Sequence, residues 1–382
     1  MATAAVILAM VLFVGCGEPS GTDVVSPLPG AESIVRAKEL VRIGRSEGDG
    51  PDVFGRVDCV SVDALGRLYV ADGMTQVIHV FDSDGRFVRS FGGTGEGPGE
   101  FLEISGMTFD GRGDAWVWDP PQHRFSVYDS TGAFIKSVPR QWRTYAVPWP
   151  GRFALGGPLL DVATELQGLD PHKRVTQRFH HVFRVVRLDT LMNRVDSTPP
   201  IGVDRTAFQG NFIVPFEGGV VAALEADGSV WSTHGPGYRI IKTNVWGDTI
   251  LKLAVDAPPV PVEAAERDSV VASMHLPPNI PAMDLDLIPK YKPAVVRLVT
   301  LAPGWVGAFP ELGGDTGRFF DVFAPDGELR ARIDLGTRLL LSRGAPTVRG
   351  RRLYGVTTDE LDVPYVVSID LGVDMTGQGS GE

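Results

Sequence analysis

The segment Gly66-Arg-Leu-Tyr-Val-Ala-Asp72 recurs 47 residues later as Gly113-Asp-Ala-Trp-Val-Trp-Asp119. The same offset relates further pairs on both sides of it (110 − 63 = 47, for example): Asp63 and Asp110, Phe81 and Tyr128, Gly85 and Gly132, and Phe87 and Phe134. Each copy consists of short β-rich runs separated by turns that contain Asp and Gly. A repeat of this length with four short strands predicts one blade of a β-propeller.

The two copies predict the same four strands. The first copy places them at 57–62, 68–71, 77–81 and 86–91, and the second at 105–109, 115–118, 124–128 and 133–138. Weaker copies are visible at 218–253, 305–333 and 345–370, and residues 148–200 fit a more irregular blade. The sequence therefore predicts an all-β, six-bladed propeller.

The last copy ends one strand short, and the other end of the chain supplies a candidate for it. Glu39-Leu-Val-Arg-Ile-Gly44 has the pattern of the outer strand Phe87-Val-Arg-Ser-Phe-Gly92. Pairing of the N- and C-terminal strands would close the ring and leave no exposed seam between blades. Two insertions interrupt the pattern: a short helix predicted at 261–274 over one rim, and residues 158–183 with His172, His180 and His181. Either insertion is a lid, a partner surface or tolerated loop decoration.

The repeat units in residues 66–92 resemble the NHL-repeat pattern, in Gly66-Arg-Leu-Tyr-Val-Ala-Asp72, Val77-Ile-His-Val-Phe-Asp82 and Asp84-Gly-Arg-Phe-Val-Arg-Ser-Phe-Gly92. The whole chain resembles the six-bladed β-propeller lipoproteins of diderm bacteria. This resemblance implies a binding scaffold in the periplasm or at the cell surface.

The N-terminal residues predict export. An apolar run from Ala2 to Gly15 ends at Cys16, and Phe13-Val-Gly-Cys16 resembles the lipobox of bacterial lipoproteins. We expect a signal peptide at 1–15, a lipidated Cys16 and flexible tether at 16–35, the propeller at 36–373 and a disordered tail at 374–382. A plain secretory signal or a buried N-terminal segment are the alternatives. The lipid would be the only contact with the membrane, most simply the outer membrane.

Charge and cysteine content narrow the function further. Forty-seven acidic and 36 basic side chains leave a net charge of −11 with no long basic run, which argues against nucleic-acid binding. Besides Cys16 the chain has one cysteine, Cys59, within the apolar run Val57-Asp-Cys-Val-Ser-Val62, so no intramolecular disulfide is expected and a buried, inert thiol is.

A polar set is predicted at one end of the propeller. Asp72, Asp119 and His234 each lie six residues after a turn glycine, so radially equivalent blades would bring them to the same rim. Together they would suit a polar ligand or a metal ion, Ca²⁺ or, with the histidine, Zn²⁺. The alternative is that each Asp accepts backbone N–H bonds in its own turn. His123 is expected near this rim but out of register with the three.

The connector after the second blade offers a second candidate surface. Its Arg and aromatic side chains are of the types that anchor binding partners: Arg140, Trp142, Arg143, Tyr145 and Trp149. Alternatively, Trp142 and Trp149 fill the gap between blades as core side chains.

The sequence thus predicts a monomeric binding module at the cell envelope, with an envelope protein or a small ligand as its partner and no required cofactor. The alternative is a metal-dependent lyase or lactonase at the tunnel mouth, because related propellers include the lactonase and regucalcin group and streptogramin lyase.

Overall fold

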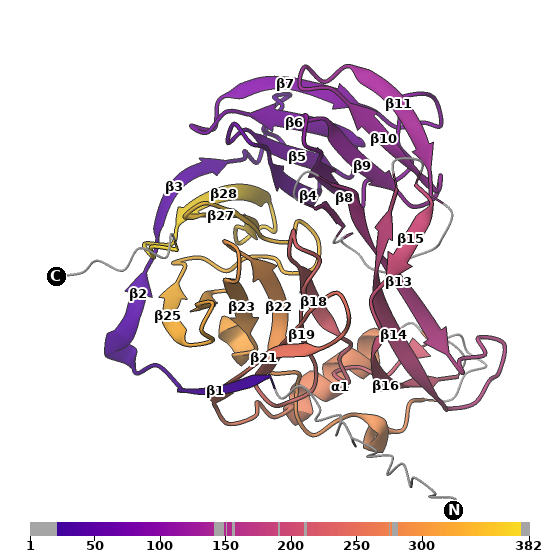
Figure 1. Ribbon diagram of the computed structural model, residues 1–382, viewed down its shortest axis with the longest axis vertical. Helices are drawn as coiled ribbons and strands as arrows, with labels where there is room; N and C mark the ends of the chain where they lie inside the picture. The colour runs from indigo at the N-terminus through magenta and orange to yellow at the C-terminus, as the bar shows by residue number, and fades with distance from the viewer. Residues whose placement is uncertain are drawn as a thin grey trace, which may run out of the picture.

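The computed structural model describes residues 21–140, 149, 151–154, 157–189, 192–209, 212–274, 276 and 282–375. In this part of the chain, the strands form six β-sheets around one central cavity. Figure 1 shows the course of the chain through these sheets. The predicted six-bladed propeller is confirmed. Each sheet is one blade, and the innermost strand of each blade lies beside the cavity.

Blades 1 and 2 match the predicted repeat. Their strands are β4 (Val57–Val62), β5 (Leu68–Asp72), β6 (Val77–Phe81) and β7 (Phe87–Gly92), then β8 (Gly106–Phe109), β9 (Ala115–Asp119), β10 (Arg124–Tyr128) and β11 (Phe134–Pro139). The last three strands of the two blades begin 47 residues apart (115 − 68, 124 − 77, 134 − 87). The turn before β5 needs glycine at Gly66, where φ is +77°.

Blade 3 is larger than predicted. It contains β12 (Arg152–Phe153), β13 (Leu159–Gln167), β14 (Gln177–Leu188), β16 (Ile201–Phe208) and β17 (Phe212–Ile213), and β15 (Arg194–Ser197) also pairs with β14. The expectation of an insertion at 158–183 was wrong, because most of these residues form β13 and β14 themselves. The inner half of β13 is buried, so its apolar residues belong to the propeller core.

The remaining blades use three or four strands from the C-terminal half of the chain. They are β18 (Val221–Leu224), β19 (Val230–Thr233), β20 (Arg239–Thr243) and β21 (Thr249–Asp256) in blade 4, β22 (Val295–Thr300), β23 (Val306–Pro310), β24 (Phe319–Phe323) and β25 (Leu329–Asp334) in blade 5, and β26 (Thr347–Arg349), β27 (Arg352–Thr358) and β28 (Pro364–Asp370) in blade 6. The fourth strand of blade 6 is β3 (Lys38–Ile43), which pairs antiparallel with β28. The predicted closure by the two ends of the chain is confirmed.

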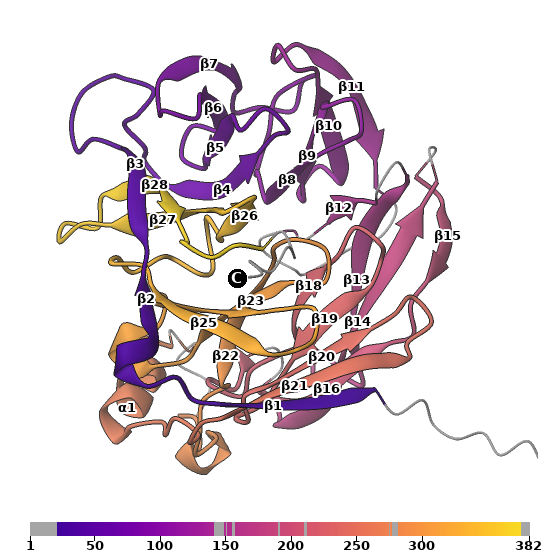
Figure 2. The ribbon, with the colours of Figure 1, turned by 60° about the vertical axis from the view of Figure 1, so that its left-hand side comes forward.

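The flexible tether expected at 16–35 is wrong for residues 22–27 and 34–36, which form strands, and residues 16–20 lie outside the described residues. Strand β1 (Thr22–Pro27) pairs in parallel with β21 of blade 4, and β2 (Ile34–Arg36) pairs in parallel with β25 of blade 5. Residues 22–43, which we call the N-terminal strap, thus run along the outer edges of three consecutive blades (Figure 2). The outer strands of blades 4 and 5 would otherwise expose unpaired N–H and C=O groups, and the strap pairs with them.

The predicted helix is present between β21 and β22 as α1 (Ala264–Ser273). A capping box between Glu263 and Glu266 begins it, and Glu266 also accepts a hydrogen bond from Lys292 Nζ at 2.5 Å. Val271 packs into an apolar cluster with Phe208 of blade 3, which fastens the helix to the ring. Short 3₁₀ turns occur at Ala31–Ser33, Leu285–Leu287 and Gly313–Asp315.

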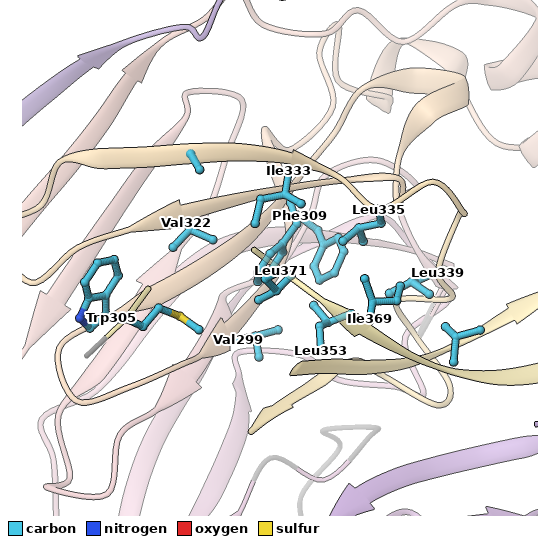
Figure 3. Close-up of a cluster of buried hydrophobic side chains, with 14 of the residues drawn as sticks. Val299, Trp305, Phe309, Val322, Ile333, Leu335, Leu339, Leu353, Ile369 and Leu371 are labelled. Atoms are coloured by element: carbon cyan, nitrogen blue, oxygen red, sulfur yellow. The ribbon is translucent and has the colours of Figure 1, made fainter. Parts of the chain in front are cut away.

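The core lies between neighbouring blades, because each sheet is covered on both faces. Figure 3 shows the interface of blades 5 and 6, where Val322 and Ile333 of blade 5 face Leu353 and Ile369 of blade 6. All four side chains are buried. Met375 is buried in the same cluster, so the start of the expected disordered tail is ordered, and its residues 376–382 lie outside the described residues.

Candidate functional site

Asp72 and Asp119 occupy equivalent positions at the ends of β5 and β9, as predicted, but their carboxylates are already engaged. Asp72 accepts hydrogen bonds from the backbone N–H groups of Gly55, Arg56 and Met74 at 3.2, 3.2 and 2.9 Å. Asp119 accepts one from the Leu102 N–H at 3.0 Å. Both residues are buried, so these carboxylates hold the blade connectors in place.

His234 is exposed beyond the end of β19. Among the residues that the structure describes, no three His, Cys, Asp or Glu side chains lie close enough together to hold a metal ion. Asp72, Asp119 and His234 are therefore not brought together as the predicted ligand set. His123 is also exposed, at the position equivalent to Gln76 in blade 1 (76 + 47 = 123), and both residues have a positive φ.

Arg140 and Trp149 are structural residues rather than exposed anchors. The Arg140 guanidinium donates to both carboxylate oxygens of Asp161, at 2.6 and 2.7 Å, and lies 4.3 Å from the centre of the Trp118 ring. The Trp149 indole N–H donates to Asp161 at 2.6 Å. This buried group joins blade 2 to blade 3. Trp142, Arg143, Tyr145 and Cys16 lie outside the described residues.

Cys59 is a buried, free thiol on β4, as expected. Burial raises its pKa to about 12, so the thiol stays protonated at neutral pH. Cys59 is therefore a packing residue of the interface between blades 1 and 2.

The inner strands of all six blades line a central channel with a cavity of about 340 Å³. The lining residues come mainly from the carboxyl-terminal halves of these strands, such as Val62 on β4 and Thr300 on β22. Asp72 pairs with Val57, the first residue of β4, so the predicted rim lies at the opposite end of the strands. The channel is a different site from the one predicted.

The charged side chains that line this cavity are all arginines: Arg152 on β12, Arg297 on β22 and Arg349 on β26. No described Asp or Glu is among the lining residues. Within the described part of the chain, nothing accepts a hydrogen bond from Arg297 or forms an ion pair with it. Burial alone lowers the pKa of Arg297 to about 10, so it remains charged at neutral pH.

Arg152 crosses from blade 3 towards its neighbours. Its Nη1 donates to the Leu224 carbonyl of blade 4 at 2.9 Å and to Thr300 Oγ1 of blade 5 at 3.0 Å. Burial lowers the pKa of Arg152, and the charges of Glu225 and Asp227 oppose that shift. The arginine is therefore held in a fixed position beside the channel.

The sequence carries a signal for this site that the repeat pattern does not show. Arg297 interrupts the apolar run Ala294-Val-Val-Arg-Leu-Val299, and no acidic residue occurs between Asp286 and Glu311. A cation in an inner strand without an acidic residue nearby in the sequence is unusual, because buried charges are normally paired. The location of Arg297 in the channel, however, follows only from the closed ring of blades.

Comparisons with known proteins agree with the fold. Residues 53–147 match a family model described as a 6-bladed beta-propeller. No curated protein matches the chain in sequence. The structure resembles that of a candidate exported protein from Bacteroides fragilis, with 10% identity, a TM-score of 0.53, and 92% of this chain and 100% of that chain covered.

A protein from Bacteroides vulgatus is similar at 10% identity and a TM-score of 0.51, with 88% of this chain and 98% of that chain covered. Virginiamycin B lyase from Staphylococcus aureus aligns at 9% identity over 87% of this chain and 98% of that chain, with a TM-score of only 0.46. Among the described residues, none of the helices has the length and apolar character needed to span a bilayer. The chain is a six-bladed β-propeller, and its residues 53–147 match the family model with that description.

Proposed function

We propose that this protein is an exported binding module whose central channel receives a small ligand. The observation that carries this proposal is Arg297, a charged side chain that lines the channel without a partner among the described residues. Arg297 is half-buried, and partial withdrawal of a guanidinium group from water without a partner is unfavourable. A bound ligand that pairs with the guanidinium would offset this cost.

The channel has the properties of a binding site for a small molecule. Its volume of about 340 Å³ lies at the lower end of the range of small-molecule sites, roughly 300–1,000 Å³. Its walls are inner strands held by their own blades, so the site is formed before the ligand arrives. A rigid, concave site of this size favours a small molecule over a folded partner protein.

Filling the channel tests this proposal. Ala222 lines the channel on β18, so Ala222→Trp is expected to obstruct it. A collection of charged and neutral small molecules is screened for compounds that raise the thermal midpoint of the purified domain. We expect compounds that stabilise the wild-type domain, and we expect the Ala222→Trp variant to lose that stabilisation.

The matched control is Ala133→Trp, which adds the same side chain at an exposed turn of blade 2. This variant should respond to the compounds as the wild type does. If no compound stabilises the wild type, or if stabilisation survives in Ala222→Trp, the channel is not the binding site.

We further propose that Cys16 carries a lipid that holds the domain at the membrane of the envelope. The apolar run before Cys16 and its resemblance to a lipobox support this proposal. Strand β1 begins at Thr22, so only residues 17–21 lie between Cys16 and the fold. The six residue steps from Cys16 to Thr22 span at most about 22 Å, so the outer edge of blade 4 would lie close to the membrane.

Substitution of the cysteine tests the anchor. In a diderm bacterial host, the wild type is expected to incorporate labelled fatty acid and to sediment with membranes, while Cys16→Ser should do neither. Cys59→Ser, which changes the buried thiol, should behave as the wild type in both assays. Labelling that persists in Cys16→Ser, or that is absent from the wild type, would rule out lipidation at this residue.

A further inference from the structure

We infer that the ligand of the central channel is a small organic anion whose carboxylate or phosphate group is bound by Arg297, with Arg152 and Arg349 beside it. This inference rests on the proposed function and specifies its ligand. The three arginines come from blades 5, 3 and 6, which places positive charge on several sides of the same cavity.

Arg297 supplies the principal contact. Its guanidinium group has five N–H donors in a planar arrangement that matches the two oxygens of a carboxylate or phosphate. None of these donors has an acceptor among the described residues, so all are available to a ligand. Such a charge-assisted pair is stronger than a neutral hydrogen bond and strengthens further when water is excluded.

Arg152 is oriented by its own contacts but not neutralised by them. Both of its hydrogen bonds leave from Nη1, and they go to the carbonyl of Leu224 and to the hydroxyl of Thr300. Neither acceptor carries a charge. Its Nε and Nη2 groups have no acceptor within the described part of the chain, so Arg152 keeps both its charge and free donors.

The two carboxylates whose charges act on Arg152 already accept hydrogen bonds from other groups. Glu225 accepts hydrogen bonds from the Trp231 indole N–H at 2.5 Å and from Lys242 Nζ at 2.9 Å. Asp227 accepts from both the N–H and the hydroxyl group of Ser229, at 2.8 and 2.6 Å. The channel therefore keeps a positive lining in a protein whose net charge is −11.

The other residues that line the channel limit the size of the anion and its remaining chemical groups. Val299 and Phe109 contribute apolar surface, while Thr108 and Thr347 contribute hydroxyl groups. A cavity of about 340 Å³ holds a compact molecule and not a polymer. The lining thus fits a small aliphatic or hydroxylated molecule with one or two anionic groups.

Thermal unfolding of the purified wild-type domain tests the inference with matched probes. Succinate, citrate and inorganic phosphate are each added at constant ionic strength, and succinamide serves as the uncharged counterpart of succinate. We expect a saturable rise of the midpoint with at least one anion and no rise with succinamide. Stabilisation by the carboxylates alone, or by phosphate alone, identifies which anionic group the site prefers.

The variant Arg297→Met separates a binding role from a structural one. Methionine keeps similar length without the half-buried charge, so the unliganded variant should unfold at a temperature no lower than that of the wild type. Its affinity for the stabilising anion should fall about tenfold to a hundredfold, which is the range expected for a hydrogen bond to a charged group. Arg330→Met, at an exposed position on β25 of the same blade, should change neither quantity.

The outcomes distinguish this inference from the proposed function. If succinamide stabilises as well as succinate, if none of the three anions stabilises, or if Arg297→Met binds the anion as tightly as the wild type, the anionic ligand is wrong. The binding function survives that result if Ala222→Trp still abolishes stabilisation by neutral compounds. If no compound of either kind binds, both proposals fail.

Discussion

The substitution Asp161→Ala is expected to lower the free energy of unfolding by about 3–5 kcal/mol, because it removes the carboxylate that is paired with the buried charge of Arg140. Both side chains of the Arg140–Asp161 pair are fully buried, and two hydrogen bonds of 2.6 and 2.7 Å join them. Removal of the carboxylate also deprives the Trp149 indole N–H of its acceptor. A loss of this size is a large fraction of the stability of a typical domain.

Chemical denaturation of the purified domain measures this effect. The matched control is Asp196→Ala, which removes the carboxylate of an exposed pair with Arg187 in the same blade. Exposed pairs contribute roughly 0–1 kcal/mol, so this variant should unfold close to the wild type. If Asp161→Ala and Asp196→Ala unfold at the same denaturant concentration, the buried pair does not join blades 2 and 3 as described.

A double substitution shows whether the charge or the packing is responsible. Arg140→Met with Asp161→Leu replaces both charges by apolar side chains, and such replacements of buried pairs are often neutral or stabilising. We expect the double variant to be more stable than Asp161→Ala. Equal losses in both variants would instead assign the effect to the hydrogen bond from Trp149 and to packing.

Removal of strand β3 is expected to prevent the domain from folding stably. A chain that begins at Gly44 lacks the fourth strand of blade 6, which pairs with β28 between Lys38 and Ile43. It also lacks Ile43, a buried residue that packs with Phe81 of blade 1. The outer edge of β28 and the contact between the last and first blades would both be exposed.

A chain that begins at Lys38 is the matched comparison, because it lacks β1 and β2 but keeps β3. Thermal unfolding and size-exclusion chromatography should show a folded domain of lower stability for this chain, and an unfolded or aggregated protein for the chain that begins at Gly44. Addition of a peptide with residues 36–45 should restore cooperative unfolding. A chain beginning at Gly44 that unfolds like the one beginning at Lys38 would show that β3 does not close the ring.

The parts of the fold that follow from local chemistry could be predicted. The Asp and Gly turns of blades 1 and 2 recur at a fixed spacing, and each fixes the two strands around it. The pairing of Glu39–Ile43 with the last blade was also predicted, because the final blade lacked one strand and this segment matched the missing pattern.

Other elements have no local signal. Strands β1 and β2 pair in parallel with strands more than 200 residues away in the sequence (251 − 22 = 229 for Thr22 and Leu251). No turn between neighbouring residues therefore predicts this pairing. In blade 3, residues 168–176 join the long strands β13 and β14, whereas the sequence pattern predicts an insertion there. Parallel edge pairing and strand length are decided by contacts that a short sequence window does not contain.

The sequence by itself determined the repeating blade, the number of blades and the ends that close them, because turn residues and strand alternation act over a few neighbouring positions. Only the tertiary structure decided which polar side chains form hydrogen bonds within the protein and which are available to a ligand. Asp72 and Arg140 resemble binding residues in the sequence, yet Asp72 accepts hydrogen bonds from backbone N–H groups and Arg140 donates hydrogen bonds to Asp161. Arg297 resembles an ordinary strand residue, yet it lines the channel without a partner among the described residues. The partners of a side chain in a propeller come from neighbouring blades far away in the chain, so they are fixed only when the ring is closed.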